Sequence, residues 1–263
     1  MNVQIGTKNG ILISAAFIDP LFLYTGTEYK IEEFPLEWYD GLYYETYKDQ
    51  VFKVDILTEK KTAAEYDNTL VIEMVNKQLN TIISYTFLSK FKNLQRLIVN
   101  NNTNLIVTDI SNNKNLISII AHNTNSIITD ISNNINLVVF TVSYTNSAIT
   151  DISNNINLTT VYLTNTNSII TDISNNINLV VLSLVNTESK ITTVSNNVKI
   201  NNLSLQETNT TAEDINQILQ DLINNNTPTS LEGVFTYSNL AGINGSLENT
   251  LSNAPYNWTL IKV

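Results

Sequence analysis

Four aspartates at equal intervals are the first residues whose type and spacing suggest chemistry. Asp109, Asp130, Asp151 and Asp172 are each 21 residues apart. If the units that carry them stack side by side, neighbouring carboxylates lie about 4.8 Å apart, and calcium prefers several oxygen ligands. No second acidic residue accompanies each aspartate, so we expect each one to cap the turn formed by the next few amides, with no metal bound.

Enzymatic chemistry has few candidate residues. Glu32, Glu33, Glu37 and Asp40 lie close together in the sequence, and paired carboxylates can hydrolyse glycosides. Runs of charge, however, are usually solvated faces. His122 is the single histidine, which excludes a histidine-rich metal site and makes any catalytic triad depend on one residue. Because there is no glycine-rich phosphate loop either, the sequence predicts a protein without enzymatic activity and without a cofactor.

Composition narrows the range of partners. The 263 residues carry a formal net charge of -10 and have a pI of about 4.5, which disfavours nucleic acid and anionic lipid. No apolar run reaches the ~18 residues of a membrane span, and the start lacks the cationic segment of a secretory signal. The absence of cysteine excludes disulfides and thiolate metal sites. We therefore expect neither nucleic-acid binding nor membrane insertion.

The aspartates belong to a tandem repeat, which must supply the elements that position them. The motif Ile-Ser-Asn-Asn-Ile-Asn-Leu begins at residues 131, 152 and 173, with variants at 110 and 194. Alignment of the units gives the pattern L-x-x-L-x-L-x-x-T, for example Leu137, Phe140, Val142 and Thr145. Its alternating apolar positions predict a short strand with one buried face.

A second apolar group in each unit, such as Ile149, Ile152 and Ile156, is expected to turn the chain back toward the next strand. One unit cannot bury its own apolar face, so neighbouring units must stack. The Asn-Asn pairs that follow each aspartate are expected to form ladders that satisfy backbone groups on the turn side. Residues 91–208 are therefore predicted to form a solenoid of about five units.

The strand pattern resembles the leucine-rich repeat, whose strand carries leucine at these offsets and asparagine at the last one. Asparagine stands there only at Asn102, and later units carry threonine, as at Thr145. The resemblance implies a solenoid of the kind that serves binding or structural roles. A different β-solenoid, such as a β-helix, is the alternative.

Residues 209–263 are predicted to cap the open end of the solenoid, which a repeat protein needs. Thr211 followed by Asp214 is a capping-box-like helix start. The amphipathic helix that follows has its apolar residues at Ile215, Ile218, Leu219, Leu222 and Ile223. We expect a strand over Leu231–Tyr237, a short helix over Leu247–Leu251 and a last strand over Trp258–Val263.

This tail also follows a longer pattern: a helix of the form D-x-x-x-I-L-x-x-L, a strand, a short helix and a final strand of the form W-x-x-I/V. The residues that carry it are Asp214, Ile218, Leu219, Leu222, Trp258 and Ile261. The pattern is similar to the closing segment of repeat proteins from phages and from bacteria of the Bacteroides type. That family usually has glycine before the tryptophan, where this chain has Asn257. The resemblance covers residues 94–263 and implies a phage virion or cell-surface component.

Residues 1–90 differ from the repeats and are interpreted as a β-rich anchoring or assembly domain. Strands are expected over Ile11–Ile18, Tyr29–Phe34, Gln50–Leu57 and Thr69–Met74, while the periodicity of Asn76–Leu88 fits a strand or a helix. Aromatic residues favour interfaces, so we expect an aromatic cluster here to mediate homo-oligomerisation; the alternative is that it forms the core of a small domain. The predicted assembly residues are Trp38, Tyr39, Tyr43 and Tyr44.

The outward face of the repeat strands is the predicted partner-binding surface. Exposed apolar residues in a contiguous strip tend to mark such surfaces, although β-branched residues are also simply good strand formers. The predicted binding residues are Ile98, Ile120, Val139, Thr141, Tyr144, Tyr162, Val181 and Ser183.

These features together predict a β-rich α+β protein with an N-terminal β domain (1–90), a leucine-rich-type solenoid of 21-residue repeats (91–208) and a C-terminal α/β cap (209–263). The leading hypothesis is a structural virion protein of a bacteriophage, in the tail or on the particle surface. It would contact other virion proteins and a host-surface protein or glycan. The alternative is a bacterial cell-surface or secreted repeat protein that binds without catalysing a reaction, and a third possibility is a rigid spacer.

Overall fold

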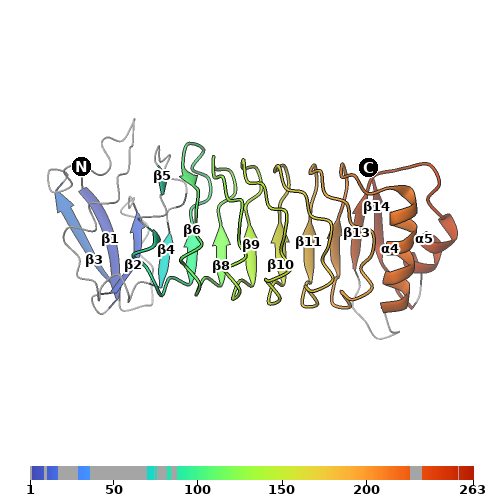
Figure 1. The fold of residues 1–263 in the computed structure, drawn as a ribbon, viewed down its shortest axis with the longest axis horizontal. Helices are drawn as coiled ribbons and strands as arrows, with labels where there is room; N and C mark the ends of the chain where they lie inside the picture. Colours follow the sequence, from blue (N-terminus) through green and yellow to red (C-terminus); the bar gives the residue numbers. More distant parts are fainter. Residues whose placement is uncertain are drawn as a thin grey trace.

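A row of short parallel strands, one from each repeat, forms the main element of the fold (Figure 1). The computed structural model describes residues 2–8, 11–16, 29–35, 70–73, 75, 82–83, 88–225, 233–253 and 255–263. Nine parallel strands form one sheet in the order β14-β13-β12-β11-β10-β9-β8-β6-β4. Strands that follow one another along the chain lie side by side, as a solenoid requires.

The strands of this sheet are short and in register. They are β4 (Val71–Glu73), β6 (Arg96–Ile98), β8 (Ser118–Ile120), β9 (Val139–Thr141), β10 (Thr160–Tyr162), β11 (Val181–Ser183), β12 (Asn202–Ser204), β13 (Val234–Tyr237) and β14 (Thr259–Lys262). At the centre of the row, Val161 pairs with Phe140 on one side and with Leu182 on the other. All three side chains are completely buried, so the predicted inward face of the repeat strand is confirmed.

The second apolar group of each repeat contributes to the same core, with one exception. Ile149 and Ile152 are buried, whereas Ile156 is 52% exposed. Asn155, which immediately precedes it, takes the inward position of that turn and is completely buried, so the next side chain points outward. Ile156 therefore belongs to the predicted turn but not to the core, and the neighbouring repeats show the same arrangement.

Buried asparagines tie each repeat to the one before it. The Asn155 amide nitrogen donates to the carbonyl oxygens of Ile131 and Asn134, both at 2.9 Å. Equivalent pairs of bonds are made in the other repeats by Asn113, Asn134, Asn176 and Asn197. Each of these carbonyls also accepts from a backbone nitrogen of its own turn, as Ile131 does from Asn134 at 2.9 Å, so the asparagine adds a second bond that joins one repeat to the next. The predicted asparagine ladder is confirmed for these residues.

Threonine replaces asparagine at the end of the repeat strand without loss of a hydrogen bond. The Asn102 amide nitrogen donates to the Val99 carbonyl, three residues earlier, at 2.8 Å. In a later repeat, the Thr166 hydroxyl donates to the Leu163 carbonyl, also three residues earlier, at 2.7 Å. Because both side chains satisfy the same backbone group, the departure from the leucine-rich pattern at this position does not change the fold.

The described residues contain one long sheet, where a β-helix would have several. On the return path, β5 (Ile82–Ile83) and β7 (Ile106–Val107) form a two-stranded parallel sheet. In the later repeats the return path consists of turns and irregular backbone. The chain therefore folds as a solenoid of the leucine-rich type.

Near the amino terminus, a second sheet is antiparallel. In it, β1 (Asn2–Lys8) lies between β2 (Ile11–Ala16) and β3 (Tyr29–Pro35). Strands β2 and β3 match predicted strands, whereas β1 falls where no strand is predicted. The predicted strand Gln50–Leu57 lies outside the described residues.

The solenoid sheet begins before residue 90, the predicted end of the first domain. Strand β4 pairs in parallel with β6, and its Ile72 lies opposite Leu97. In the segment Asn76–Leu88, for which the sequence fits a strand or a helix, the structure describes the short strand β5. The parallel stacking therefore includes chain that precedes the first recognisable repeat.

After the last repeat, α4 (Ala212–Asn225), β13, α5 (Gly245–Ser252) and β14 follow in the predicted order. The Thr211 backbone nitrogen and hydroxyl both donate to the Asp214 carboxylate, and the Asp214 nitrogen donates back to the Thr211 hydroxyl. This is the predicted capping box. Strands β13 and β14 extend the solenoid sheet, and the two helices lie at its end (Figure 1). Neither these helices nor any other described segment has the helical length and hydropathy needed to span a bilayer.

Helix α4 supplies one of the two bonds that the asparagine of a further repeat would make to the last one, and it adds a bond from its own Asp221. The Val194 carbonyl accepts from the Asn225 amide at 2.9 Å, and the Val194 nitrogen donates to the Asp221 carboxylate at 2.9 Å. Thr193 stands at the position of the repeated aspartate, and its hydroxyl also donates to Asp221. An aspartate at position 193 would bring two carboxylates together, so the change to threonine has a clear electrostatic reason.

The backbone conformation explains why Asn257 can stand where the resembling family usually has glycine. Asn257 has a φ of 54°, in the left-handed region that glycine and asparagine adopt most readily. The next residue, Trp258, is 2% exposed. Its ring lies so close to Gly233 that a Cβ there would be 2.4 Å from a ring carbon.

Candidate functional site

The outward rows of the strand sheet form the predicted binding surface. Five of the predicted residues are partly exposed along it: Ile98, Ile120, Val139, Thr141 and Val181. Tyr162 is 37% exposed on β10. Ser183 departs from the prediction, because it is 7% exposed and its hydroxyl shares a 2.9 Å hydrogen bond with the hydroxyl of Thr164.

The remaining predicted binding residue does not lie on the strand face. Tyr144 lies in the turn after β9, where it is 58% exposed. The assembly residues Trp38, Tyr39, Tyr43 and Tyr44 lie outside the described residues, so their role stays a prediction.

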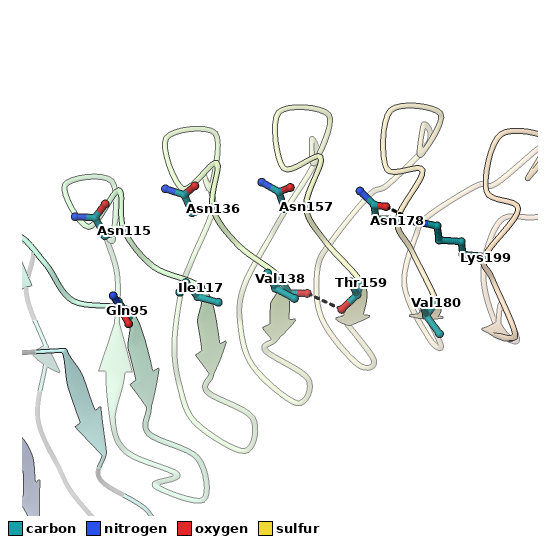
Figure 2. Close-up of a pocket in the computed structure, with 10 residues that line it drawn as sticks. All are labelled: Gln95, Asn115, Ile117, Asn136, Val138, Asn157, Thr159, Asn178, Val180 and Lys199. Atoms are coloured by element: carbon teal, nitrogen blue, oxygen red, sulfur yellow. Dashed lines mark hydrogen bonds between the residues drawn. The ribbon is translucent and has the colours of Figure 1, made fainter.

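A groove runs along one edge of the strand sheet, across successive repeats (Figure 2). Its volume is about 650 Å³. One wall is a polar row formed by Asn115, Asn136, Asn157, Asn178 and Lys199. The second row, immediately before the strands, consists of Gln95, Ile117, Val138, Thr159 and Val180. Because each row takes one residue from each repeat, the groove follows the long axis of the solenoid.

Hydrogen bonds to the backbone fix the amides of the polar row. The Asn157 nitrogen donates to the Ile135 carbonyl, and the Asn178 nitrogen donates to the Ile156 carbonyl, both at 3.1 Å. The Asn178 side-chain oxygen in turn accepts from the Lys199 ammonium at 2.6 Å. Because the nitrogens of this row bind the backbone, the side-chain oxygens are the atoms that can accept hydrogen bonds from a ligand.

The groove and the outward positions of β6 to β12 carry no acidic side chain, although the chain as a whole is acidic. Among the residues that line the groove and the outward positions of β6 to β12, the charged residues are Arg96 and Lys199. At these positions, the repeats between them present only aliphatic, aromatic, amide and hydroxyl groups. The surface is therefore uncharged at its centre, with one cation near each end.

The repeated aspartates serve the turns, as predicted. The Asp151 carboxylate accepts from the Ser153 backbone nitrogen at 2.7 Å, and the other three repeats have the same bond. This bond lowers the pKa of Asp151 below its ordinary value of 3.8, and the bond to Ser174 does the same for the pKa of Asp172. Within the described ranges, no group of three or more His, Cys, Asp or Glu side chains is arranged to hold a metal ion.

The catalytic candidates are only partly described. Burial lowers the pKa of His122 below its ordinary value of 6.5. Glu32 and Glu33 belong to β3, whose side chains are not described, and Glu37 and Asp40 lie outside the described residues. The absence of enzymatic activity therefore stays a sequence-based prediction.

The groove was not predicted, although the sequence contains a signal for it. The 21-residue period that reveals the strands also places asparagine at 115, 136, 157 and 178 and a β-branched residue at 117, 138, 159 and 180. These positions precede the strands, so a search confined to the strand faces does not find them.

No protein-family model matches the chain, and no curated protein matches it. Among solved structures, the chain is similar to a plant ice-binding protein, at 12% identity over 75% of this chain and 66% of the other, with a TM-score of 0.45. An internalin from Listeria monocytogenes is 16% identical over 81% of this chain and 73% of its own, with a TM-score of 0.41.

The leucine-rich-repeat ectodomain of a receptor kinase from Arabidopsis thaliana, solved in complex with Casparian strip integrity factor 2, is 12% identical over 77% of this chain. The TM-score is 0.42, and the chain spans only 31% of that ectodomain. With TM-scores below 0.5, the assignment of the leucine-rich-type fold rests on the strand pairing and the buried repeat positions described above.

Proposed function

We propose that this chain is a non-enzymatic binding protein whose strand face and adjoining groove hold a protein partner. The observation that carries the proposal is the continuous surface without acidic side chains that crosses the repeats of an otherwise acidic chain. Depletion of charge is typical of the core of protein interfaces. Because the surface is built on a row of hydrogen-bonded strands, a partner meets side chains that need little reordering, which lowers the cost of binding.

The two cations at the ends of the surface fit the same proposal. Arg96 is exposed on β6, and Lys199 closes the row of groove amides. At the rim of an interface, charges such as these act mainly on association rate and specificity. A partner with acidic groups flanking a neutral stretch would match the surface best.

Matched lysine variants test this proposal. Thr141→Lys and Tyr162→Lys place a charge on the strand face, whereas Thr150→Lys places one at an exposed position in the return turns. Immobilised full-length protein is incubated with a surface-protein fraction of candidate host cells, and the captured proteins are quantified by mass spectrometry. We expect a defined set of proteins to be lost from the first two variants and retained by Thr150→Lys. Equal capture by all three variants would favour the rigid-spacer alternative.

Two biological settings are proposed for this binding. One is the bacterial cell surface or the extracellular medium, and the other is a phage virion. The tail pattern is shared by phage proteins and by proteins of Bacteroides-type bacteria, so it fits both settings. Mass-spectrometric detection of the chain in purified phage particles supports the virion setting, whereas its detection in the surface or secreted fraction of uninfected cells supports the bacterial one.

We also propose that the amino-terminal segment mediates homo-oligomerisation. Light scattering of the full chain is compared with that of a truncation that begins at Thr69, because β4 belongs to the solenoid sheet and a start near residue 90 would remove it. A full-length oligomer and a monomeric truncation are the expected result. Monomers in both cases would remove the assembly role.

A further inference from the structure

The turn after each strand holds one residue in a left-handed backbone conformation. The φ angle is 60° at Asn101, 53° at Asn123, 54° at Asn165 and 52° at Asn186. Asparagine tolerates this region better than other residues with a side chain. Four repeats thus carry a residue suited to the turn, but Tyr144 occupies the same position with a φ of 56°.

Tyr144 is an unfavourable residue for this turn and gains little from packing. Its ring is 58% exposed, so burial does not compensate for the backbone conformation. Glu207, with a φ of 54°, is the other exception, and its backbone nitrogen bonds the Ser238 hydroxyl of the tail at 2.8 Å. The Tyr144 nitrogen makes the equivalent bond to the Thr164 carbonyl at 2.8 Å, so the two exceptions share the backbone bond of the turn, and only Tyr144 places an exposed aromatic ring there. Backbone strain that persists without a packing benefit is a pointer to function.

A shallow polar hollow adjoins the Tyr144 ring. Its volume is about 330 Å³. It is lined by Asn101, Thr103, Asn123, Thr124, Asn125 and Tyr144. Apart from the tyrosine, every lining side chain is an amide or a hydroxyl, which can both donate and accept hydrogen bonds.

Tyr144 also interrupts a ladder of side-chain amides. On one side, the Asn123 nitrogen donates to the Asn101 side-chain oxygen at 2.9 Å. On the other side, the Asn186 nitrogen donates to the Asn165 side-chain oxygen in the same direction. An asparagine at 144 would continue this ladder to the Asn123 oxygen. The tyrosine has no amide to donate, and Asn123 and Tyr144 both line the hollow.

We propose that Tyr144 and the amides of Asn101, Asn123 and Asn125 form a binding site for a neutral saccharide. A pyranose has an apolar C–H face, which packs against an exposed aromatic ring, and hydroxyl groups at its edge, which bond to amides. The hollow supplies both groups within neighbouring repeats. The site does not depend on the protein-binding proposal, because Tyr144 lies in a turn and not on the strand face.

The absence of charge defines the class of saccharide. No residue that lines the hollow is charged, and the chain carries a net charge of -10. A sulfated or acidic sugar would therefore meet repulsion without a local cation. An apolar peptide side chain would have to dehydrate amides and hydroxyls without replacing their hydrogen bonds, which is unfavourable.

Saturation-transfer NMR on the full-length protein tests the proposal. The probes are the methyl glycosides of glucose, galactose, mannose and N-acetylglucosamine. We expect saturation transfer from the protein to the ring C–H protons of at least one glycoside. The signal should persist in Tyr144→Phe, which keeps the ring, and should fall to background in Tyr144→Asn.

The Tyr144→Asn variant also excludes misfolding as the cause of a lost signal. It restores the residue that four other repeats have at this position and should continue the amide ladder. We expect its Tm to rise by roughly 1–4 °C, the size of shift that a small relief of strain gives in a chain of this length.

Tyr162→Thr is the matched control, because it removes an exposed tyrosine from the strand face and leaves the hollow intact. It should leave the saccharide signal unchanged, whether or not it alters protein capture, so the two proposals can fail separately. Absence of transfer to all four glycosides, or equal transfer to wild type and Tyr144→Asn, overturns the saccharide site.

Discussion

The two sides of each repeat follow different constraints. On the turn side, the position of Asn155 holds asparagine in every repeat from Asn113 to Asn197. On the strand side, equivalent outward positions hold different residues, such as Thr141 and Tyr162. The turn asparagine makes two bonds to buried carbonyls of the preceding repeat, whereas the outward strand side chains satisfy no such group. The position whose side chain bonds the buried backbone holds the same residue in all five repeats. The outward strand positions, whose side chains do not, are available for recognition.

Removal of a turn asparagine should have the largest effect on stability. Asn155→Ala removes one of the two hydrogen bonds accepted by each of the Ile131 and Asn134 carbonyls, and each such bond contributes about 0.5–1.5 kcal/mol. We expect the free energy of unfolding to fall by about 1–3 kcal/mol, measured by urea denaturation. The control is Asn154→Ala, at an exposed neighbouring position, with an expected change within about 0.5 kcal/mol. Equal losses in the two variants would contradict the distinction between the sides.

At the end of the strand, the identity of the donor should matter less than its presence. Thr166→Val removes the hydroxyl that donates to the Leu163 carbonyl, so we expect a loss of about 1–2 kcal/mol in the free energy of unfolding. Thr166→Asn should recover most of it, because Asn102 makes the equivalent bond. If Thr166→Asn is as unstable as Thr166→Val, then the two donors are not interchangeable.

The turn aspartates should make a smaller contribution that depends on pH. The pKa of Asp151 is lowered in the folded state, so its ionised form stabilises the fold above the ordinary pKa of 3.8. This contribution is lost as the pH falls from that value toward the lower folded-state pKa. We expect Asp151→Asn to show a smaller drop in Tm than wild type between neutral and acidic pH. Because the carboxylate is well exposed, the difference should be small, and identical pH profiles would show that the turn bond adds no stability.

Substitutions on the strand face should change stability least. Thr141→Lys is expected to alter the free energy of unfolding by no more than about 0.5 kcal/mol, because the side chain is partly exposed and supports no buried group. Protein capture, by contrast, should be lost. A large loss of stability in this variant would show that the strand face is also constrained by the fold.

The sequence predicts the solenoid well because the same period governs burial and hydrogen bonding. The inward position of Phe140 follows from alternation alone, and the Thr211–Asp214 cap follows from a local pattern. The exposure of Ile156 does not follow from its apolar character, because the buried amide of Asn155 takes the inward position. A search for apolar residues does not detect an asparagine that is buried in the core through its hydrogen bonds.

The start of the sheet and the ligand sites were harder to predict. Strand β4 lacks the repeat motif, so only its pairing with β6 shows that it belongs to the solenoid. The groove combines positions from many repeats, and its shape depends on their stacking. The left-handed turn at Tyr144 becomes apparent only when its φ angle is compared with that of Asn123 and the other turns.

The bonds made by helix α4 mean that the helix can close a solenoid of any number of repeats. Each repeat presents the same carbonyl to its successor, and at the last repeat Asn225 binds the Val194 carbonyl as the next repeat's asparagine would. A whole unit can therefore be added or removed without a change in the chemistry at the end. Each added unit would lengthen the groove by one strand spacing, about 4.8 Å. Duplication or loss of a 21-residue segment can thus change the length of the binding surface.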